Sequence, residues 1–175
     1  LHPQANPNRN HMHTRERQAE QLHMAGIETV PAPSLDGVNP DLLSLGLTSS
    51  FTMLVPGGAK HRPGKRWPSA KYRDLAQQLD SSIAPVVVVG TADEQALADE
   101  IVKDIPSALN LAGKTSLLQL VGIAKAAKAA VGNDSGPMHV AAVAGTPSVV
   151  LYSNDSDPAL CAQRGADVTI LRRPS

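Results

Sequence analysis

The sequence has one cysteine, only four aromatic side chains and no excess of charge of either sign. The single Cys161 cannot form an internal disulfide, which favours a reducing compartment. With so few aromatic residues the interior must consist of Val, Leu, Ile and Ala, which suits parallel strands covered by Ala-rich helices. The 16 basic and 16 acidic residues balance, so no overall field attracts nucleic acid or an anionic membrane surface. Any anion site must therefore be local, and we expect no nucleic-acid partner.

Long apolar runs are also lacking. The longest falls far short of the ~20 residues that span a bilayer, and no segment resembles a signal peptide. We therefore expect a cytoplasmic protein. The 175 residues include 13 glycines and 14 prolines, which indicates one globular domain with many turns. A domain of this length buries roughly 70% of its unfolded surface. Because the chain begins at Leu1 and not at Met, we expect it to be a piece of a longer protein.

The first 46 residues differ from the rest. Residues 14–25 form a weakly amphipathic pattern that predicts a helix ended by Gly26. A segment rich in Pro, Gly, Asp and Asn follows and predicts a linker. We therefore divide the chain into a connecting helix and linker over residues 1–46 and a compact domain over residues 47–175.

The compact domain alternates between strand and helix patterns. A helix is predicted with Pro68 in its first turn, others over 92–103 and 137–144, and a further one from Ser116, where Gln119 completes a capping box. The apolar runs of strand length are residues 51–55, 85–90, 108–111, 129–132, 148–152 and 167–171. This order predicts an α/β fold with a Rossmann-like, doubly wound parallel sheet.

In such a sheet the ligand lies beyond the carboxyl ends of the strands. The loop after the first strand contains Gly57 and Gly58, and six Lys or Arg residues occur from Lys60 to Arg73. Glycines allow close approach of the backbone, so this loop is a candidate phosphate site, although it matches neither a Walker A loop nor GxGxxG. The alternative is a solvated basic loop.

Two further loops carry candidate ligands. Glu94 follows the second strand, where it can accept hydrogen bonds from ribose hydroxyls or only favour the helix dipole. After the fourth strand, Asp134 or Ser135 can cap a helix and Gly136 leaves its first amides open, which predicts a pyrophosphate site. His139 has no capping role and is either a ligand or a structural residue. A nucleophilic pair of Ser135 and His139 is disfavoured because no Gly-x-Ser-x-Gly elbow surrounds the serine.

The histidines of the polar leader, His2, His11 and His13, lack a Cys or carboxylate set at ligand spacing. We therefore predict no metal site.

Several motifs in fixed order resemble glycosyltransferase family 9, the heptosyltransferases of lipopolysaccharide synthesis. They extend from about Phe51 to Tyr152 and comprise Gly57-Gly58, Lys65-Arg66-Trp67-Pro68, Val89-Gly90 with Glu94, 111–117 (LAGKTSL), 133–139 (NDSGPMH) and Gly145-Thr146-Pro147. The resemblance implies that this chain is the C-terminal, donor-binding domain of a GT-B fold, and that the N-terminal acceptor domain lies outside it.

The resemblance also implies a reaction and a set of ligands. The reaction is an inverting, metal-independent transfer of heptose from ADP-heptose or a similar donor to the lipid A-linked core, with no cofactor, at the inner face of the bacterial inner membrane with peripheral membrane contact. Lys65 is implied to lie against the donor phosphates, Glu94 against the ribose and Thr115 beside the adenine. The donor's phosphates and sugar would be lined by Gly57, Gly58, Asp134, Ser135, Gly136 and His139.

The sequence also departs from the family. The catalytic base belongs to the N-terminal domain, so its identity is unknown here and we expect this chain alone to bind the donor without turnover. Residues 153–158 replace the usual Phe-Gly-Pro-Thr turn. Two alternatives stay open: a non-catalytic nucleotide-binding module, and a nucleotide-sugar epimerase-like domain.

Overall fold

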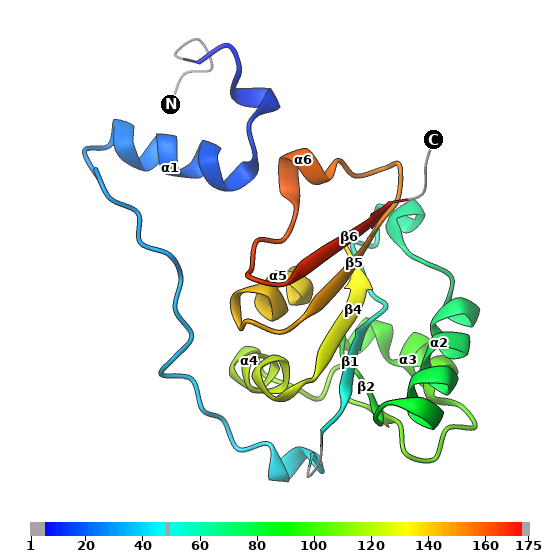
Figure 1. Ribbon diagram of the computed structural model, residues 1–175. Helices are drawn as coiled ribbons and strands as arrows, with labels where there is room; N and C mark the ends of the chain where they lie inside the picture. The colour runs from blue at the N-terminus through cyan, green and yellow to red at the C-terminus, as the bar shows by residue number, and fades with distance from the viewer. Residues whose placement is uncertain (1–5, 48–49, 173–175) are drawn as a thin grey trace.

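The sheet predicted from the sequence is present. A computed structural model describes residues 6–47 and 50–172, and its six strands are all parallel, in the order β3-β2-β1-β4-β5-β6. This is the order of a doubly wound, Rossmann-like sheet (Figure 1). The strands are β1 (Thr52–Val55), β2 (Val86–Val88), β3 (Leu109–Asn110), β4 (Ala129–Asn133), β5 (Ser148–Tyr152) and β6 (Val168–Arg172).

Helices cover both faces of the sheet. On one face lie α2 (Ser69–Ser82) and α3 (Gln95–Val102), and on the other lie α4 (Leu117–Ala126) and α5 (Gly136–Val143) (Figure 1). The short α6 (Pro158–Cys161) precedes β6, and α1 (Thr14–Met24) lies before the linker. The described single-turn 3-10 helices are η2 (Arg9–His11), η3 (Leu43–Leu45), η4 (Pro63–Lys65) and η5 (Ala92–Glu94).

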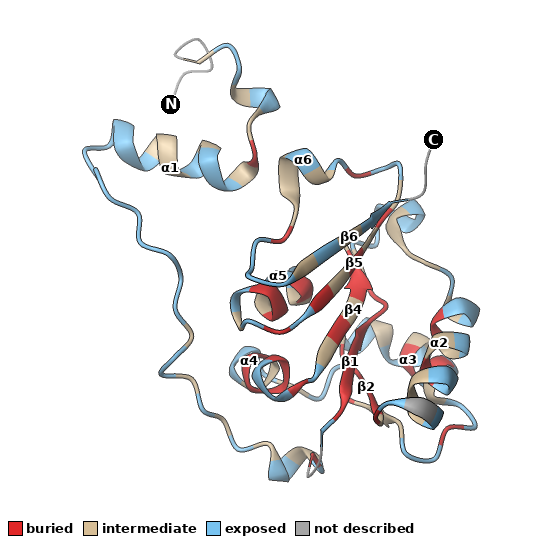
Figure 2. Ribbon diagram, viewed as in Figure 1, coloured by how far each residue is buried: buried red, intermediate tan, exposed pale blue. Residues whose placement is uncertain are grey.

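The core is aliphatic on both faces, and β1 shows why. Its side chains alternate between the faces. Met53 packs with Ile123 and Met138 of α4 and α5, whereas Leu54 packs in a second cluster with Ile101 of α3. All four residues of β1 are buried, so this strand is red in the burial view (Figure 2). A strand buried on both faces is a continuous apolar run, which is why the sequence revealed these strands.

Two helix starts differ in detail from the prediction. The capping box of Ser116 and Gln119 is present at the start of α4. The helix predicted over residues 92–103 instead begins as η5 and continues as α3, because Thr91 and Glu94 form a capping box around η5. Pro68 is the residue before α2 and does not lie in its first turn.

The segment before the sheet contacts the domain at two places. Thr14 Oγ1 donates a hydrogen bond of 3.0 Å to Leu160 O, which joins α1 to α6. Further along, Lys125 Nζ of α4 donates to the carbonyl oxygens of Leu35 and Val38. The linker thus passes along α4, as the long arm in Figure 1 shows. The division at residues 46 and 47 stays a prediction.

No helix in the described ranges 6–47 and 50–172 is both long and apolar enough to cross a bilayer.

The strand order reverses between β1 and β4, which pair in parallel from Thr52–Ala129 to Val55–Gly132. A crevice opens at such a point because the crossovers on either side run to opposite faces of the sheet. The loop after β1 and the start of α5 therefore meet at one edge of the sheet.

Truncation of Ile101, which is fully buried in α3, is expected to lower the free energy of unfolding by about 2–5 kcal/mol in Ile101→Ala, because the neighbours cannot fill the cavity left behind. Leu118→Ala, on the exposed side of α4, should change it by less than about 0.5 kcal/mol. Urea denaturation of both variants measures this, and equal losses would contradict the two-sided core.

Candidate functional site

A cavity of about 780 Å³ lies at the carboxyl edge of the sheet, where β1 and β4 end. It is formed by the loop after β1, the start of η5, the loop before α4 and the start of α5. This volume is in the range of small-molecule sites. Of the nine predicted ligand residues it brings together seven: Gly57, Gly58, Glu94, Thr115, Asp134, Ser135 and Gly136.

The glycine loop packs directly against Glu94. A Cβ on Gly57 would overlap the carboxylate of Glu94, so only glycine fits there without a shift. Gly58 N donates to Glu94 Oε1 at 3.0 Å, and the guanidinium of Arg66 donates to Gly58 O. Hydrogen bonds thus fix both the amide and the carbonyl group of Gly58. The loop is ordered by these contacts and is more than a solvated basic segment.

Glu94 has a structural role and also faces the cavity. Its Oε2 accepts from Thr91 N at 2.8 Å to close the capping box, and its side chain is only 13% exposed. Each carboxylate oxygen has two lone pairs, so each retains an acceptor site after these backbone bonds. The two roles considered from the sequence are therefore compatible in one side chain.

Lys65 lies beside the cavity, paired with Asp134. Lys65 Nζ lies 2.5 Å from Asp134 Oδ2, and the two side chains are 13% and 7% exposed. Lys65 does not line the cavity itself but pairs with a residue that does. One of its three N–H donors is used by Asp134, which leaves two for a ligand.

Asp134 is surrounded by hydrogen-bond donors. Ser156 Oγ donates to Oδ2 at 2.6 Å, while Tyr152 OH and Gln163 Nε2 each donate to Oδ1 at 3.1 Å. Burial by itself raises the pKa of Asp134, but hydrogen bonds from Lys65, Ser156 and Gln163 outweigh it and lower the pKa to about 2. The carboxylate is therefore charged at neutral pH and fixes the position of the Lys65 ammonium.

The segment that departs from the family pattern supplies part of this shell. Ser156 lies within the divergent residues 153–158, and Gln163 follows α6. Neither residue was predicted as part of the site. No local motif marks them, because their partner Asp134 precedes them by 22 and 29 residues.

Asn133, at the end of β4, was also missed as a site residue. It is fully buried, and its Nδ2 donates to Pro56 O at 2.7 Å and to Gly57 O at 3.2 Å. Its Oδ1 accepts from Trp67 N at 3.0 Å and Tyr72 OH at 3.1 Å. All four hydrogen bonds of the amide are thus directed at the segment after β1. Asn133 belongs to the motif 133–139 that the sequence pointed to, but its hydrogen-bond partners can be identified only from the structure.

The start of α5 lacks the side-chain cap that the sequence suggested. Ser135 is the N-cap residue, but no side chain caps the helix, so the capping role predicted for Asp134 or Ser135 is wrong. Asp134 turns instead to Lys65, and Ser135 Oγ is buried without a hydrogen-bond partner in the described chain. No heavy atom lies within 4 Å of a Cβ placed on Gly136. The first turn of α5 is therefore open toward the cavity that Ser135, Gly136 and Pro137 line.

His139 lies elsewhere. It lines a second cavity of about 250 Å³ between α1 and α5, and is not among the residues of the first cavity. Burial lowers the pKa of His139, the charge of Asp134 raises it and His13 lowers it, with a net decrease. One turn beyond Gly136, the side chain faces α1 and not the glycine loop.

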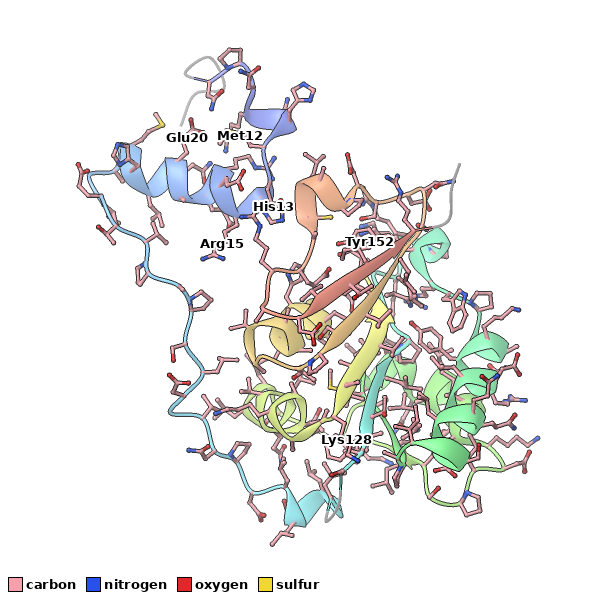
Figure 3. The ribbon with its side chains drawn as sticks, viewed as in Figure 1. Met12, His13, Arg15, Glu20, Lys128 and Tyr152 are labelled. Carbon is pink, nitrogen blue, oxygen red and sulfur yellow. The ribbon has the colours of Figure 1, made fainter. Side chains whose placement is uncertain are left out.

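The described histidines of the N-terminal segment, His11 and His13, do not form a cluster. His13 caps α1, since its Nδ1 accepts from Arg15 N at 3.2 Å, and its Nε2 lies 3.0 Å from Ala162 O (Figure 3). His11 is exposed and His2 lies outside the described residues. Within residues 6–47 and 50–172 no three His, Cys, Asp or Glu side chains lie close enough to hold a metal ion.

The pairing of Asp134 predicts a pH-dependent stability. Because its pKa in the folded protein is about 2 and the unfolded value is about 3.8, its contribution is present above pH ~4 and is lost as the pH falls toward 2. The free energy of unfolding of the native chain should exceed that of Asp134→Asn by about 2 kcal/mol near pH 6, an order-of-magnitude figure, and this difference should shrink below pH ~4. Urea denaturation at several pH values measures it.

A matched control is Asp93→Asn. Asp93 pairs with Lys60 at 2.5 Å, but both side chains are exposed. Its loss should change the pH profile little. A difference between native and Asp134→Asn that stays constant from pH 6 to 2 would contradict the assignment.

Comparison with known proteins agrees with this geometry. Lipopolysaccharide heptosyltransferase 2 of Salmonella typhimurium is 43% identical over 104 residues, 57% of this chain and 30% of that protein. The heptosyltransferase 2 of Escherichia coli is 42% identical over the same shares. The chain thus spans about 30% of the length of these curated relatives.

Solved structures give the same result. The structure of E. coli ADP-heptose lps heptosyltransferase II superposes with a TM-score of 0.71 at 35% identity, over 77% of this chain and 42% of that one. An E. coli heptosyltransferase solved with ADP has a TM-score of 0.73 at 22% identity over 94% of this chain and 51% of its own, and supports the fold alone. The sheet is thus one Rossmann-like half of a GT-B fold. The model of glycosyltransferase family 9 (heptosyltransferase) matches residues 9–173, and the chain belongs to this family.

Proposed function

We propose that this chain is the donor-binding domain of an inverting, metal-independent heptosyltransferase that transfers heptose from ADP-heptose to the lipopolysaccharide inner core. The observation that carries the proposal is the cavity at the end of β1 and β4, where an ordered glycine loop, a carboxylate and an open helix start meet. Relatives named as lipopolysaccharide heptosyltransferases, and a structure at 35% identity named as an ADP-heptose lps heptosyltransferase, support the choice of donor.

Each part of the cavity suits one part of the donor. The amide of Gly136 at the start of α5 and the two free donors of Lys65 suit the diphosphate. Glu94 offers acceptor sites to ribose hydroxyls. Thr115 lies in the loop before α4, where we place the adenine.

The chemistry of this domain is electrostatic. When the bond between the sugar and the diphosphate breaks, negative charge grows on the departing ADP. Lys65 and the Gly136 amide are held in place before the reaction, so they stabilise this charge without rearrangement. The catalytic base belongs to the N-terminal acceptor domain in this proposal. The present chain therefore binds the donor but does not transfer the sugar.

The whole enzyme, in this proposal, takes a lipid A-linked acceptor through its other domain and works at the inner face of the bacterial inner membrane. Residues 1–46 then form the connection between the domains.

The chain is expected to bind ADP with equal affinity in the presence and absence of a chelator, because Lys65 and backbone amides meet the phosphate charge. Lys65→Met should weaken ADP by about 10- to 150-fold, the equivalent of a charged hydrogen bond of 1.5–3 kcal/mol. Lys71→Met removes an exposed charge from α2 and should leave the affinity unchanged. Calorimetry measures all three.

Loss of binding on chelation would overturn metal independence. If a full-length enzyme bound ADP-heptose but transferred no sugar to the acceptor, the chain would be a non-catalytic nucleotide-binding module instead.

Replacement of Glu94 separates ribose recognition from loop support. Glu94→Gln should weaken ADP by about 1.5–3 kcal/mol and inorganic pyrophosphate much less, since only ADP has the ribose. The control Glu100→Gln removes a carboxylate that pairs with Arg73 on the surface and should affect neither ligand. Equal losses of ADP and pyrophosphate would show that Glu94 only supports the glycine loop.

A further inference from the structure

The loop of residues 153–158, which departs from the family pattern, lies against the segment that carries Lys65. A Cβ on Gly64 would overlap the carboxylate of Asp155, so the loop packs onto η4, whose last residue is Lys65. The next residue of the loop, Ser156, donates from its Oγ to Asp134 Oδ2 at 2.6 Å. The loop therefore contacts both the segment of Lys65 and the carboxylate that pairs with Lys65.

Local hydrogen bonds direct Ser156 into the interior. Ser153 O accepts from Ser156 N at 3.3 Å, and Ser153 Oγ accepts from Asp155 N at 3.2 Å. On the other side, Asp157 caps α6 by accepting from Ala159 N at 3.0 Å. These bonds fix the backbone before and after Ser156. Of the six residues of the loop, all of them described, only Ser156 is buried.

The two oxygens of the Asp134 carboxylate have different partners. Oδ1 accepts from Tyr152 OH and Gln163 Nε2, each at 3.1 Å. Oδ2 accepts from Lys65 Nζ at 2.5 Å and from Ser156 Oγ at 2.6 Å, so the ammonium and the hydroxyl each occupy one of its lone pairs. With Ser156 in place, Lys65 is restricted to the remaining lone pair, and the directions of its other two hydrogens are defined. Without the hydroxyl, the ammonium can move over both lone pairs of Oδ2.

We propose that Ser156 is a positioning residue for the donor: it holds Asp134 so that the Lys65 ammonium presents its two free hydrogens to the diphosphate. This rests on the proposed function, in which the diphosphate is the group that Lys65 binds. Ser156 does not line the cavity at the end of β1 and β4, so it acts through Asp134 and Lys65 and not by touching the donor.

Calorimetry with ADP and inorganic pyrophosphate tests this role. Ser156→Ala should weaken both ligands by the same factor, about two- to tenfold, the range of one hydrogen bond, because the effect is on the phosphates alone. Glu94→Gln, in contrast, should weaken ADP more than pyrophosphate. When Lys65 is already replaced by Met, Ser156→Ala should cause no further loss, because its effect passes through Lys65.

The matched control is Ser34→Ala. Ser34 Oγ donates to Asp36 Oδ2 at 2.8 Å, the same kind of bond in the exposed linker. Its loss should leave both affinities unchanged.

A second measurement needs no ligand. The pKa of Asp134 can be followed by a pH titration of its carboxyl ¹³C NMR signal, and Ser156→Ala should raise it from about 2 toward its ordinary value, because one hydrogen bond to the charged form is lost. The other titratable groups that face Asp134 are unchanged in this variant: Lys65, His139, Tyr152 and Cys161. An unchanged pKa would overturn the proposal.

Two binding results would also overturn it. One is an equal loss of ADP affinity from Ser156→Ala with and without Lys65, and the other is a loss for ADP with none for pyrophosphate. If the native chain bound neither ligand, the proposed function itself would fail and the diphosphate role with it. If the native chain and Ser156→Ala bound ADP equally, only the positioning role would fail.

Discussion

The cavity at the end of β1 and β4 depends on the contacts that the last residues of β4 make with the loop after β1. A loop after a parallel strand has no ladder to hold it, and this one also contains two adjacent glycines, Gly57 and Gly58. The side-chain amide of Asn133 holds this loop in place with four hydrogen bonds to the segment from Pro56 to Tyr72. The next residue, Asp134, pairs with Lys65, which lies within the same segment. These two side chains, together with the bonds of Glu94 and Arg66 to Gly58, fix the glycine backbone and the cation at the edge of the sheet.

The same carboxylate ties the site to the segment that precedes the domain. Asp134 accepts from Gln163, and the neighbouring carbonyl oxygens of Leu160 and Ala162 bind Thr14 and His13 at the start of α1. The position of α1 and the position of Lys65 are therefore set by one short stretch of chain, residues 160–163. The divergent residues 153–158 belong to this arrangement, because Ser156 contributes one of the bonds to Asp134.

The sequence predicted the sheet and most of the cavity, but not the contacts that organise them. The six strands were recognisable because strands buried on both faces are continuous apolar runs, and the ligand loops followed from their carboxyl ends. Seven of the nine predicted ligand residues line one cavity for that reason. The shell around Asp134 could not be predicted, since Tyr152, Ser156 and Gln163 reach it from the next strand and beyond. His139 shows the same limit: the sequence placed it one turn into α5, but only the packing of α1 shows which side it faces. The ligand assignments themselves remain predictions.

The charged side chains around the cavity at the end of β1 and β4 are paired, so net charge alone would not attract a diphosphate there. The charge of Lys65 is cancelled by Asp134, Lys60 is paired with Asp93, and Arg66 lies 3.9 Å from Glu94. This local balance matches the zero net charge of the whole chain. Selectivity must then come from directed donors, namely the amide of Gly136 and the two free hydrogens of the Lys65 ammonium, whose position Asp134 fixes. Such a site favours an anion whose oxygens meet these donors over anions in general, as the function proposed above requires.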